Sequence, residues 1–216
     1  ILKSETLLAK PVFQNMFPWA PSNKIFGDLT DMFTPEFITK LDKIKNSDFR
    51  FPKDRKPYIH QVESWISTLK DNKSILVTTG TGSGKTECFM LPVLHDIFVN
   101  SPNSQGINAI FLYPLNALIG SQKKRMHSWC EALGNINYAI YNGNTKNTAP
   151  VNKQDKSYPE IISRLGIRET PPQILFTNPT MLEYLLVRDS DSQILNKSKG
   201  KLRWILLDEA HTLTGS

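Results

Sequence analysis

The 216-residue sequence lacks several features that mark whole classes of protein. No apolar run approaches the roughly 20 residues that a helix needs to cross a bilayer. The first ten residues, ILKSETLLAK, have neither the long apolar stretch nor the small-residue cleavage site of a secretory signal. Internal repeats and low-complexity tracts are missing as well. These absences exclude a membrane or secreted protein, and we expect a cytoplasmic one.

Cysteine is scarce, and neither sign of charge dominates. Cys88 and Cys130 lack the paired spacing of a disulfide framework or a metal site, so we expect reduced thiols. Lys and Arg number 26 against 20 Asp and Glu, a net charge of +6. This mild excess favours an anionic partner such as nucleic acid without identifying one. The 39% of hydrophobic residues suffices for the core of one domain with an extension.

Residues 1–50 form a mixed segment with no sustained apolar period. We expect a partly helical N-terminal extension that packs on the main domain, with no function that its residues reveal. Its aromatic side chains are expected in the core and not at a ligand, because buried aromatic residues are the commoner case. These residues are Phe13, Phe17, Trp19, Phe26, Phe33 and Phe37.

From Tyr58 onward, short β-type runs alternate with longer helical ones, the pattern of βαβ units around a parallel sheet. Continuous apolar runs such as AIFLY and WILL suit strands that helices cover on both faces. We therefore expect a three-layer α/β fold with a mainly parallel sheet. The predicted strands are 74–78, 107–113, 136–141, 173–177 and 204–208. The predicted helices are 60–70, 85–100, 116–133, 158–165 and 179–188, with solvated loops at 142–156 and 189–201.

A glycine-rich turn follows the first predicted strand. SILVTTGTGSGKTECFMLPVL runs from an apolar strand through the turn into a helix, the context that confirms a phosphate-binding loop. Gly80, Gly82 and Gly84 allow backbone N–H groups to curl around phosphate oxygens, and the helix start adds its positive dipole end. Lys85 is expected against the β- and γ-phosphates of ATP, and the Thr86 hydroxyl on Mg²⁺.

The loop departs from G-x-x-x-x-G-K-[ST] at one place, because Thr79 occupies the first glycine position. A glycine-rich turn with an incidental lysine is the alternative, and a second motif downstream counts against it. The predicted nucleotide contacts are Thr79, Gly80, Thr81, Gly82, Ser83, Gly84, Lys85 and Thr86.

The second motif, RWILLDEAH, places two carboxylates at the end of an apolar strand, where ligands bind in open α/β sheets. Asp208 is expected to hold Mg²⁺ through its water shell, and Glu209 to orient and deprotonate the attacking water. The alternative is a pair of charges that favours a helix N-terminus. Together with the phosphate loop, hydrolysis of a nucleoside triphosphate is the economical interpretation.

With both motifs present, the chain resembles the first RecA-like, ATP-binding lobe of superfamily 2 DEAD/DEAH-box helicases, in the Lhr- and MrfA-like DNA helicase branch. The resemblance spans about residues 51–216 and implies a RecA-like P-loop domain, an ATP hydrolase of helicase type, and ATP and Mg²⁺ as cofactors. It assigns His211 of the DEAH box to coupling. PYIHQVESW is similar to the glutamine motif, so Gln61 is the candidate for pairing with the adenine edge, unless it is only a solvated residue.

Two further segments resemble motifs that hold the sugar–phosphate backbone of one nucleic-acid strand. LYPLNALIGSQ is similar to motif Ia, and FTNPTMLEYLL to motif Ib. Helix starts with free N–H groups bind phosphates without reading bases. For Leu118, Met181 and Leu182 we expect core packing instead. The expected strand contacts are Pro114, Asn116, Gln122, Thr177, Asn178 and Pro179.

The same resemblance bears on partners. YNGNT at 141–145 is similar to the family's YDGDT, but Asn142 and Asn144 replace both acids, and their role is not carried over. The wording of motifs Ia and Ib favours DNA over RNA despite the DEAH lettering. Repair and defence helicases share it, so partners in such complexes are also expected.

The sequence ends at HTLTGS, and the second RecA-like lobe with its arginine finger follows this point in relatives. We expect this lobe as a partner within a longer chain, and weak nucleotide binding and hydrolysis without it. Two alternatives stay open. One is a nucleic-acid-stimulated switch or remodelling motor that does not separate strands. The other is a non-catalytic binding module, which the intact Lys85, Thr86, Asp208 and Glu209 count against.

Overall fold

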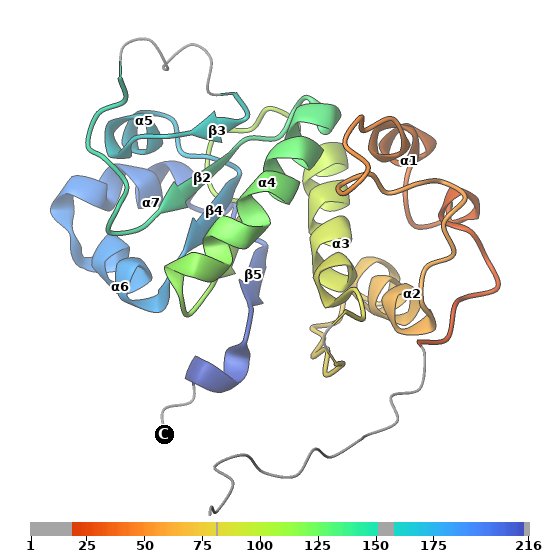
Figure 1. The fold of residues 1–216 in the computed structure, drawn as a ribbon. Coiled ribbons are helices and arrows are strands. Elements are labelled where there is room, and N and C mark those ends of the chain that lie inside the picture. The colour runs from red at the N-terminus through yellow and green to blue at the C-terminus, as the bar shows by residue number, and fades with distance from the viewer. Residues whose placement is uncertain (1–18, 81, 151–157, 214–216) are drawn as a thin grey trace, which may run out of the picture.

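The computed structural model describes residues 19–80, 82–150 and 158–213, which contain one five-stranded parallel sheet (Figure 1). The strand order is β3-β2-β4-β1-β5, so successive strands are joined by crossovers, as parallel pairing requires. The predicted parallel sheet is confirmed. Its strands are β1 (Ala109–Leu112), β2 (Tyr138–Tyr141), β3 (Glu160–Ile161), β4 (Ile174–Thr177) and β5 (Trp204–Leu207).

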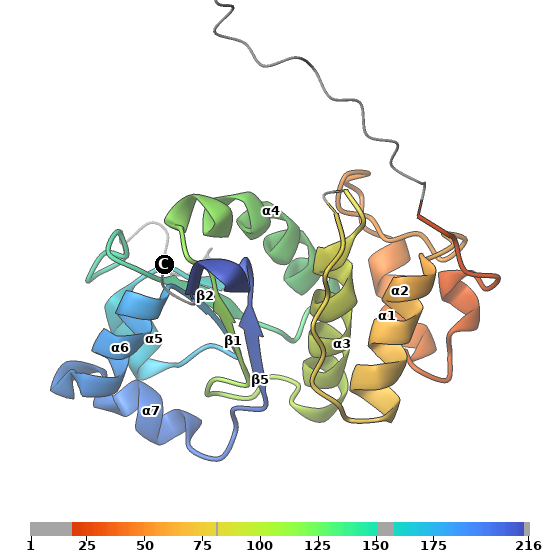
Figure 2. The ribbon, with the colours of Figure 1, turned by 90° about the horizontal axis from the view of Figure 1, so that it is seen from below.

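Helices cover both faces of this sheet, and Figure 2 shows α4 on one side with α6 and α7 on the other. Alternate residues of β1 enter different cores: Phe111 packs with helices α1 to α4, and Ile110 with α5 to α7. The three-layer α/β fold is therefore confirmed. The helices are α1 (Pro35–Asp42), α2 (Ile59–Trp65), α3 (Lys85–Asn100), α4 (Asn116–Leu133), α5 (Arg164–Glu169), α6 (Pro179–Val187) and α7 (Ser192–Ser198).

Two predicted helices, 85–100 and 116–133, have the expected bounds. Within the part of the chain that the structure describes, no helix is both long and apolar enough to cross a membrane. Short helical turns lie between the longer elements. The turns are η1 (Phe26–Asp28), the π-helical η2 (Ile66–Lys70) that continues α2, η4 (Asp189–Asp191) and η5 (Ala210–Leu213).

The described part of the N-terminal extension belongs to the core next to α2 and α3. The rings of Phe26 and Phe33 are fully buried against Trp65, with ring centroids 6.1 and 5.2 Å away. Thr34 caps α1 by accepting from Phe37 N, so the predicted partly helical character is confirmed. The predicted core positions at Phe13 and Phe17 lie outside the described residues.

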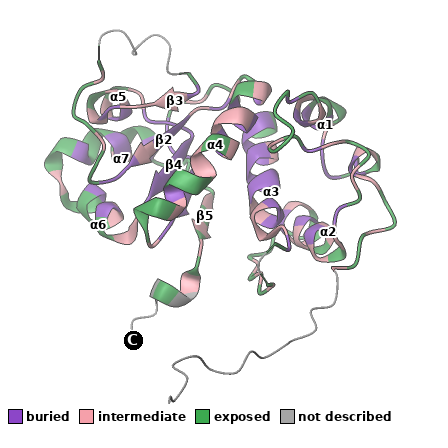
Figure 3. Ribbon diagram, in the orientation of Figure 1, coloured by how far each residue is buried: buried purple, intermediate pink, exposed green. Residues whose placement is uncertain are grey.

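The predicted strand at 74–78 is wrong. The segment is extended, but it pairs with none of the described strands, and Leu76 is 81% exposed. An apolar run becomes a strand only where a neighbouring strand offers its backbone groups. Within the described residues, β5 pairs with β1 alone, so the segment 74–78 does not use its free edge. Ile205 and Leu207 of β5 are 63% and 52% exposed, so coverage of both faces holds for β1 and β4 but not for β5 (Figure 3).

Two other predictions need correction. The helix predicted at 158–165 starts only at Arg164, because Ser163 caps it and residues 160–161 pair with β2 as strand β3. The loop predicted at 189–201 contains η4 and α7, since Asp191, Ile194 and Ser198 form a buried helical face within a polar sequence. The loop predicted at 142–156 is described only to residue 150, where it has no helix or strand.

Candidate nucleotide and nucleic-acid sites

The phosphate loop is closed by its own hydrogen bonds. Gly82 and Gly84 have φ of +79° and +75°, the left-handed conformation that glycine adopts without strain. Lys85 Nζ donates to the Thr79 carbonyl at 2.7 Å, and the hydroxyls of Thr79 and Ser83 share a hydrogen bond of 2.7 Å. The lysine therefore already spans the loop in which phosphate would lie. Thr81 lies outside the described residues.

Two consecutive side chains of α2 bind two consecutive carbonyls of this loop. His60 Nε2 lies 2.9 Å from the Ser83 carbonyl, and Gln61 Nε2 donates to the Gly84 carbonyl at 3.1 Å. A carbonyl can only accept, so His60 must carry its proton on Nε2. Gln61 is fully buried, and its Oε1 accepts from Tyr58 N at 2.9 Å. Its amide thus faces the protein at both ends, and its adenine contact stays a prediction.

Further contacts join the loop to the extension and to α2. A Cβ added to Gly80 would lie 3.4 Å from the ring of Trp19, which in turn packs edge-on against His60 at 5.6 Å. Trp65 Nε1 donates to the carbonyl of Glu87 in the first turn of α3 at 2.9 Å. The phosphate loop and the helix after it are therefore contacted by Trp19, before the predicted domain boundary at residue 50, and by Trp65, after it.

The acidic box approaches the loop from β5. Burial raises the pKa of the Asp208 carboxyl, the negative charge of Glu209 adds to the rise, and the Glu209 N–H and the positive charge of Lys85 oppose it. The influence of Lys85 places the ends of the two motifs within electrostatic range of each other. Asp208 N donates to the Leu112 carbonyl at 3.0 Å, which fixes the box beside the end of β1.

Glu209 has φ of +49°, an uncommon conformation for a residue with a Cβ and one that clusters at functional sites. Its carbonyl accepts from Thr212 N at 2.9 Å and from the Thr212 hydroxyl at 2.8 Å, which starts η5. The side chain of Glu209 is exposed, as a residue that meets water and substrate must be. The side chain of His211 lies outside what the structure describes.

The residues at this site fit a bound Mg²⁺. Magnesium prefers oxygen ligands and is usually held by one or two protein groups together with phosphates and water. The half-buried Thr86 and Asp208 supply one hydroxyl and one carboxylate of this kind, from α3 and from the end of β5.

The segments similar to motifs Ia and Ib meet at the ends of the neighbouring strands β1 and β4. Asn116 is the first residue of α4, and Asn178 caps α6 by accepting from Met181 N at 2.8 Å. The two asparagines are joined directly, because Asn178 Nδ2 donates to Asn116 Oδ1 at 3.1 Å. Thr177 is fully buried, and its hydroxyl donates to the Tyr141 carbonyl at 2.7 Å, so it ties β4 to β2.

The other residues of these segments divide between core and surface. Met181 is buried at 6% exposure, and Leu118 and Leu182 pack against the two cores, so the core packing expected of all three is confirmed. Pro114, Gln122 and Pro179 are half-buried, and the exposed Asn116 starts its helix beside them.

Residues 59–216 match the family model for the DEAD/DEAH box helicase. The chain belongs to this family. It is 31% identical over 160 residues to the uncharacterized ATP-dependent helicase MJ1574 of Methanocaldococcus jannaschii, which covers 74% of this chain and 21% of that protein. It is 28% identical over 158 residues to the ATP-dependent helicase Lhr-Core of Saccharolobus solfataricus, covering 70% of this chain and 16% of that one.

The fold matches a solved helicase structure. The helicase MrfA bound to DNA and AMPPNP superposes with a TM-score of 0.59 at 25% identity, over 89% of this chain and 23% of MrfA. The RecA-like helicase fold is thus confirmed. The chain spans about a fifth of the length of these relatives.

Several residues that organise this helicase fold were not predicted. Arg164 donates to the carbonyls of Thr145 and Asn142 at 2.8 and 2.9 Å and so holds the YNGNT turn. Glu87 and Arg125 form an ion pair of 3.2 Å between α3 and α4. His60 and Glu87 are each next to a motif residue in the sequence, which is a weak indication of their roles. Arg164 has none, because only the fold brings it to the turn.

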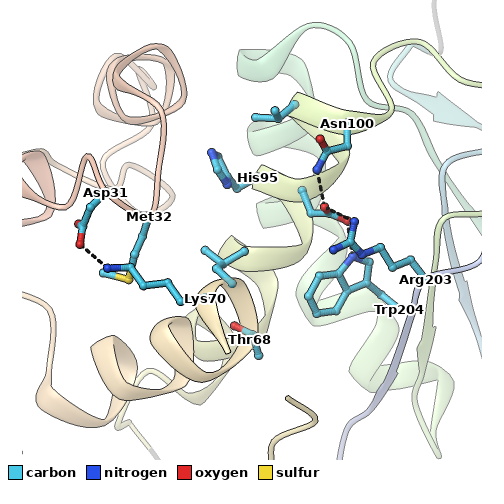
Figure 4. A pocket seen from close by; sticks show the side chains of 11 residues that line it. Asp31, Met32, Thr68, Lys70, His95, Asn100, Arg203 and Trp204 are labelled. Carbon is cyan, nitrogen blue, oxygen red and sulfur yellow. Dashed lines mark hydrogen bonds and ion pairs between the residues drawn. The ribbon is translucent and has the colours of Figure 1, made fainter. Parts of the chain in front are cut away.

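A separate cavity of about 180 Å³ lies between α3, η2 and the start of β5, at the opposite end of that strand from Asp208 (Figure 4). Asp96 of α3 accepts there from Asn100, Arg203 and Trp204 at 2.7, 3.0 and 2.6 Å. These bonds fasten the last turns of the phosphate-loop helix to the first residue of β5. The far ends of the two elements that carry Lys85 and Asp208 are therefore clamped together.

Proposed function

We propose that this chain is the ATP-binding lobe of a helicase or translocase that couples hydrolysis of ATP–Mg²⁺ to movement along one nucleic-acid strand. The observation that carries the proposal is the phosphate loop itself, which Lys85 Nζ spans at 2.7 Å to the Thr79 carbonyl, with the Asp208 carboxylate after β5 close enough for the charge of Lys85 to lower its pKa. A cation on a phosphate-binding loop opposite a carboxylate is the arrangement that phosphoryl transfer needs.

In this proposal each group has a defined role. The loop amides and Lys85 bind the β- and γ-phosphates, for which Lys85 leaves the Thr79 carbonyl. Glu209 orients the attacking water and accepts its proton. Mg²⁺, held by Thr86 and Asp208, would neutralise charge that develops on the phosphate oxygens. His60 and Gln61 keep the loop carbonyls turned outward, so that the amides remain available to phosphate.

The proposed grip on the strand lies where α4 and α6 begin. Asn116 and Asn178 are joined there, and Thr177 supports them from the sheet. The positive dipole ends of two helices suit phosphates of a backbone and do not read bases. We favour DNA because MrfA, the structural neighbour, is bound to DNA.

The complete machine is proposed to include a second RecA-like lobe. The chain corresponds to about a fifth of its relatives, which leaves length for that lobe in a longer protein. Such a lobe would close over the nucleotide and supply cationic stabilisation of the transition state. Cytoplasmic location and partners in a repair or defence complex are part of the same proposal.

Nucleotide binding is tested by Lys85→Ala in the complete protein, with a titration of a fluorescent ATP analogue. We expect affinity to fall on the order of tenfold or more, the scale of a lost charge-assisted contact, with an unchanged melting temperature. Lys199→Ala, an exposed lysine after α7, is the matched control. Equal affinities in Lys85→Ala and the control would contradict the proposed phosphate site.

The strand grip is tested by Asn178→Asp. Aspartate caps a helix as well as asparagine does, so α6 should keep its stability while the added charge repels phosphates. We expect weaker binding of a labelled single strand for every sequence tried, and a steep loss of affinity with salt in the wild type. ATP affinity should not change. A flat salt dependence, or a loss confined to one sequence, would mean that these helix starts do not hold a backbone.

A further inference from the structure

Tyr113 carries a buried hydroxyl that has no hydrogen-bond partner among the described residues. The residue directly follows β1 and is 1% exposed. Its ring is fixed by packing, stacked on Phe176 at 5.9 Å and 16°. Because an unpaired buried hydroxyl costs free energy, a phenylalanine would serve the core better at this position.

The hydroxyl lies on the same face of the sheet as Asp208. Leu112 and Leu207 are partners in the parallel ladder between β1 and β5, so Tyr113 and Asp208 are the next pair along it. Partners in a ladder point to the same face. Tyr113 lies in the core on the α1-to-α4 face, and Leu206, two residues before Asp208, packs against that core too.

The charges around the hydroxyl agree with this placement. Burial is the main cause that raises the pKa of Tyr113, the negative charge of Asp208 raises it further, and the positive charge of Arg125 opposes the rise. Asp208 Oδ1 accepts from Glu209 N at 3.1 Å, whereas none of the described residues donates to Oδ2. Among the described residues, this neighbourhood thus contains one buried donor without an acceptor and one carboxylate oxygen without a donor.

We propose that Tyr113 is a positioning residue of the ATPase site, whose hydroxyl donates to the Asp208 carboxylate and holds it in place when nucleotide and Mg²⁺ bind. This inference rests on the proposed function. Tyr113 touches neither phosphate nor water in it, and acts only through Asp208. Arg125, paired with Glu87 of α3 at 3.2 Å, lies in range of the same hydroxyl from the helix that is proposed to hold the strand.

Tyr113→Phe in the complete protein tests the inference, because it removes the hydroxyl and keeps the ring. We expect a melting temperature without nucleotide that is equal to or higher than that of the wild type. ATP turnover should fall about tenfold, the scale of one lost hydrogen bond to a charged group. The Mg²⁺ concentration for half-maximal turnover should rise, while the affinity for the ATP analogue without Mg²⁺ stays constant.

Tyr138→Phe is the matched control. Tyr138 is also fully buried on this face, but it lies on β2, and its hydroxyl is 3.2 Å from His127 Nδ1. Loss of this partnered hydroxyl should lower the melting temperature by a few degrees and leave Mg²⁺ dependence unchanged.

The outcomes separate the inference from the function on which it rests. Unchanged turnover and Mg²⁺ dependence in Tyr113→Phe, with an active wild type, would overturn this inference alone. A fall in melting temperature together with turnover, without a shift in Mg²⁺ dependence, would make the hydroxyl structural and overturn it too. A complete wild-type protein that does not hydrolyse ATP would overturn both.

Discussion

Two sides of the molecule differ in how fully they are packed: the first is the centre of the sheet at β1 and β4, and the second is the edge strand β5 with the segment 74–78. In β1 and β4 every residue is buried, and each pairs with two neighbouring strands. In β5 every second residue is exposed, and the segment 74–78 before the phosphate loop pairs with no described strand. The proposed chemistry belongs to the second side, since Asp208 directly follows β5 and the phosphate loop with Lys85 follows the segment 74–78.

This difference shows how stability and function are divided along one chain. Burial of apolar strands on both faces supplies the free energy that holds the fold. The acidic box and the adjoining end of β1 instead contain strained backbone at Glu209, a desolvated carboxylate at Asp208 and, at Tyr113, a hydroxyl without a partner among the described residues. Features that cost stability are thus gathered where binding and catalysis are proposed.

The largest effect is expected from a variant that stops ATP hydrolysis without changing the packing on either side. Glu209→Gln should lower ATP turnover by a factor on the order of 10² or more, because the amide cannot accept a proton from water. Affinity for ATP and the melting temperature should match the wild type. Steady-state kinetics of the complete protein measure this, and unchanged turnover would reject Glu209 as the base.

The next prediction compares two buried carboxylates: Asp191 in η4, away from the proposed site, and Asp96 in α3, the helix that starts with Lys85. Asp191 is fully buried and accepts from Tyr141 at 2.6 Å and Arg168 at 2.7 Å. Asp191→Ala leaves both donors without their acceptor, so we expect a loss of about 3 kcal/mol in the free energy of unfolding. Asp96→Ala should cost less, about 2 kcal/mol, because its partner Arg203 is 54% exposed and can be rehydrated.

The same pair should differ in function. Asp96→Ala loosens the clamp between α3 and β5, so ATP affinity should fall even where the protein is folded, whereas Asp191→Ala should leave it intact. Denaturant melts and nucleotide titrations on both variants measure the contrast. Equal affinity losses would mean that Asp96 has no special influence on the site.

A smaller effect is expected at His60. His60→Ala removes the donor to the Ser83 carbonyl, and a neutral hydrogen bond of this kind is worth a factor of about five in ATP affinity. His60→Gln places an amide N–H near the position of Nε2 and should restore most of the loss. If glutamine fails to rescue binding, the contact does not position the loop.

The smallest effect concerns Asp208 and pH. Its folded pKa is raised, so the folded protein holds a proton on this carboxyl more tightly than the unfolded chain does. Stability from this group is therefore present at low pH and lost as pH rises through the folded pKa. Asp208→Asn removes the desolvated charge and should therefore raise the melting temperature slightly at pH 7. A lower melting temperature at pH 7 would contradict the assigned desolvation.

Sequence patterns predicted the packed side well and the site only in part. The bounds of α3 and α4 follow from a phosphate-loop motif and from Gly134 directly after the last helical residue. A local pattern did not predict that 74–78 would lack a partner, because pairing depends on distant strands. The roles of Tyr113, Arg164 and Asp96 likewise depend on neighbours far along the chain. The polar composition of residues 189–201 predicted a loop, although the segment contains α7, whose polar residues surround a short buried face.

The contact between Gln61 and Gly84 has a consequence for evolution. A side chain at position 84 would collide with the carboxamide of Gln61 and would also adopt an unfavourable φ. A shorter residue at position 61 would relieve the collision but not the unfavourable φ, so position 84 requires glycine whatever residue occupies position 61. Among descendants of this gene position 84 should therefore stay glycine, whereas position 61 is constrained only to supply a donor to the Gly84 carbonyl.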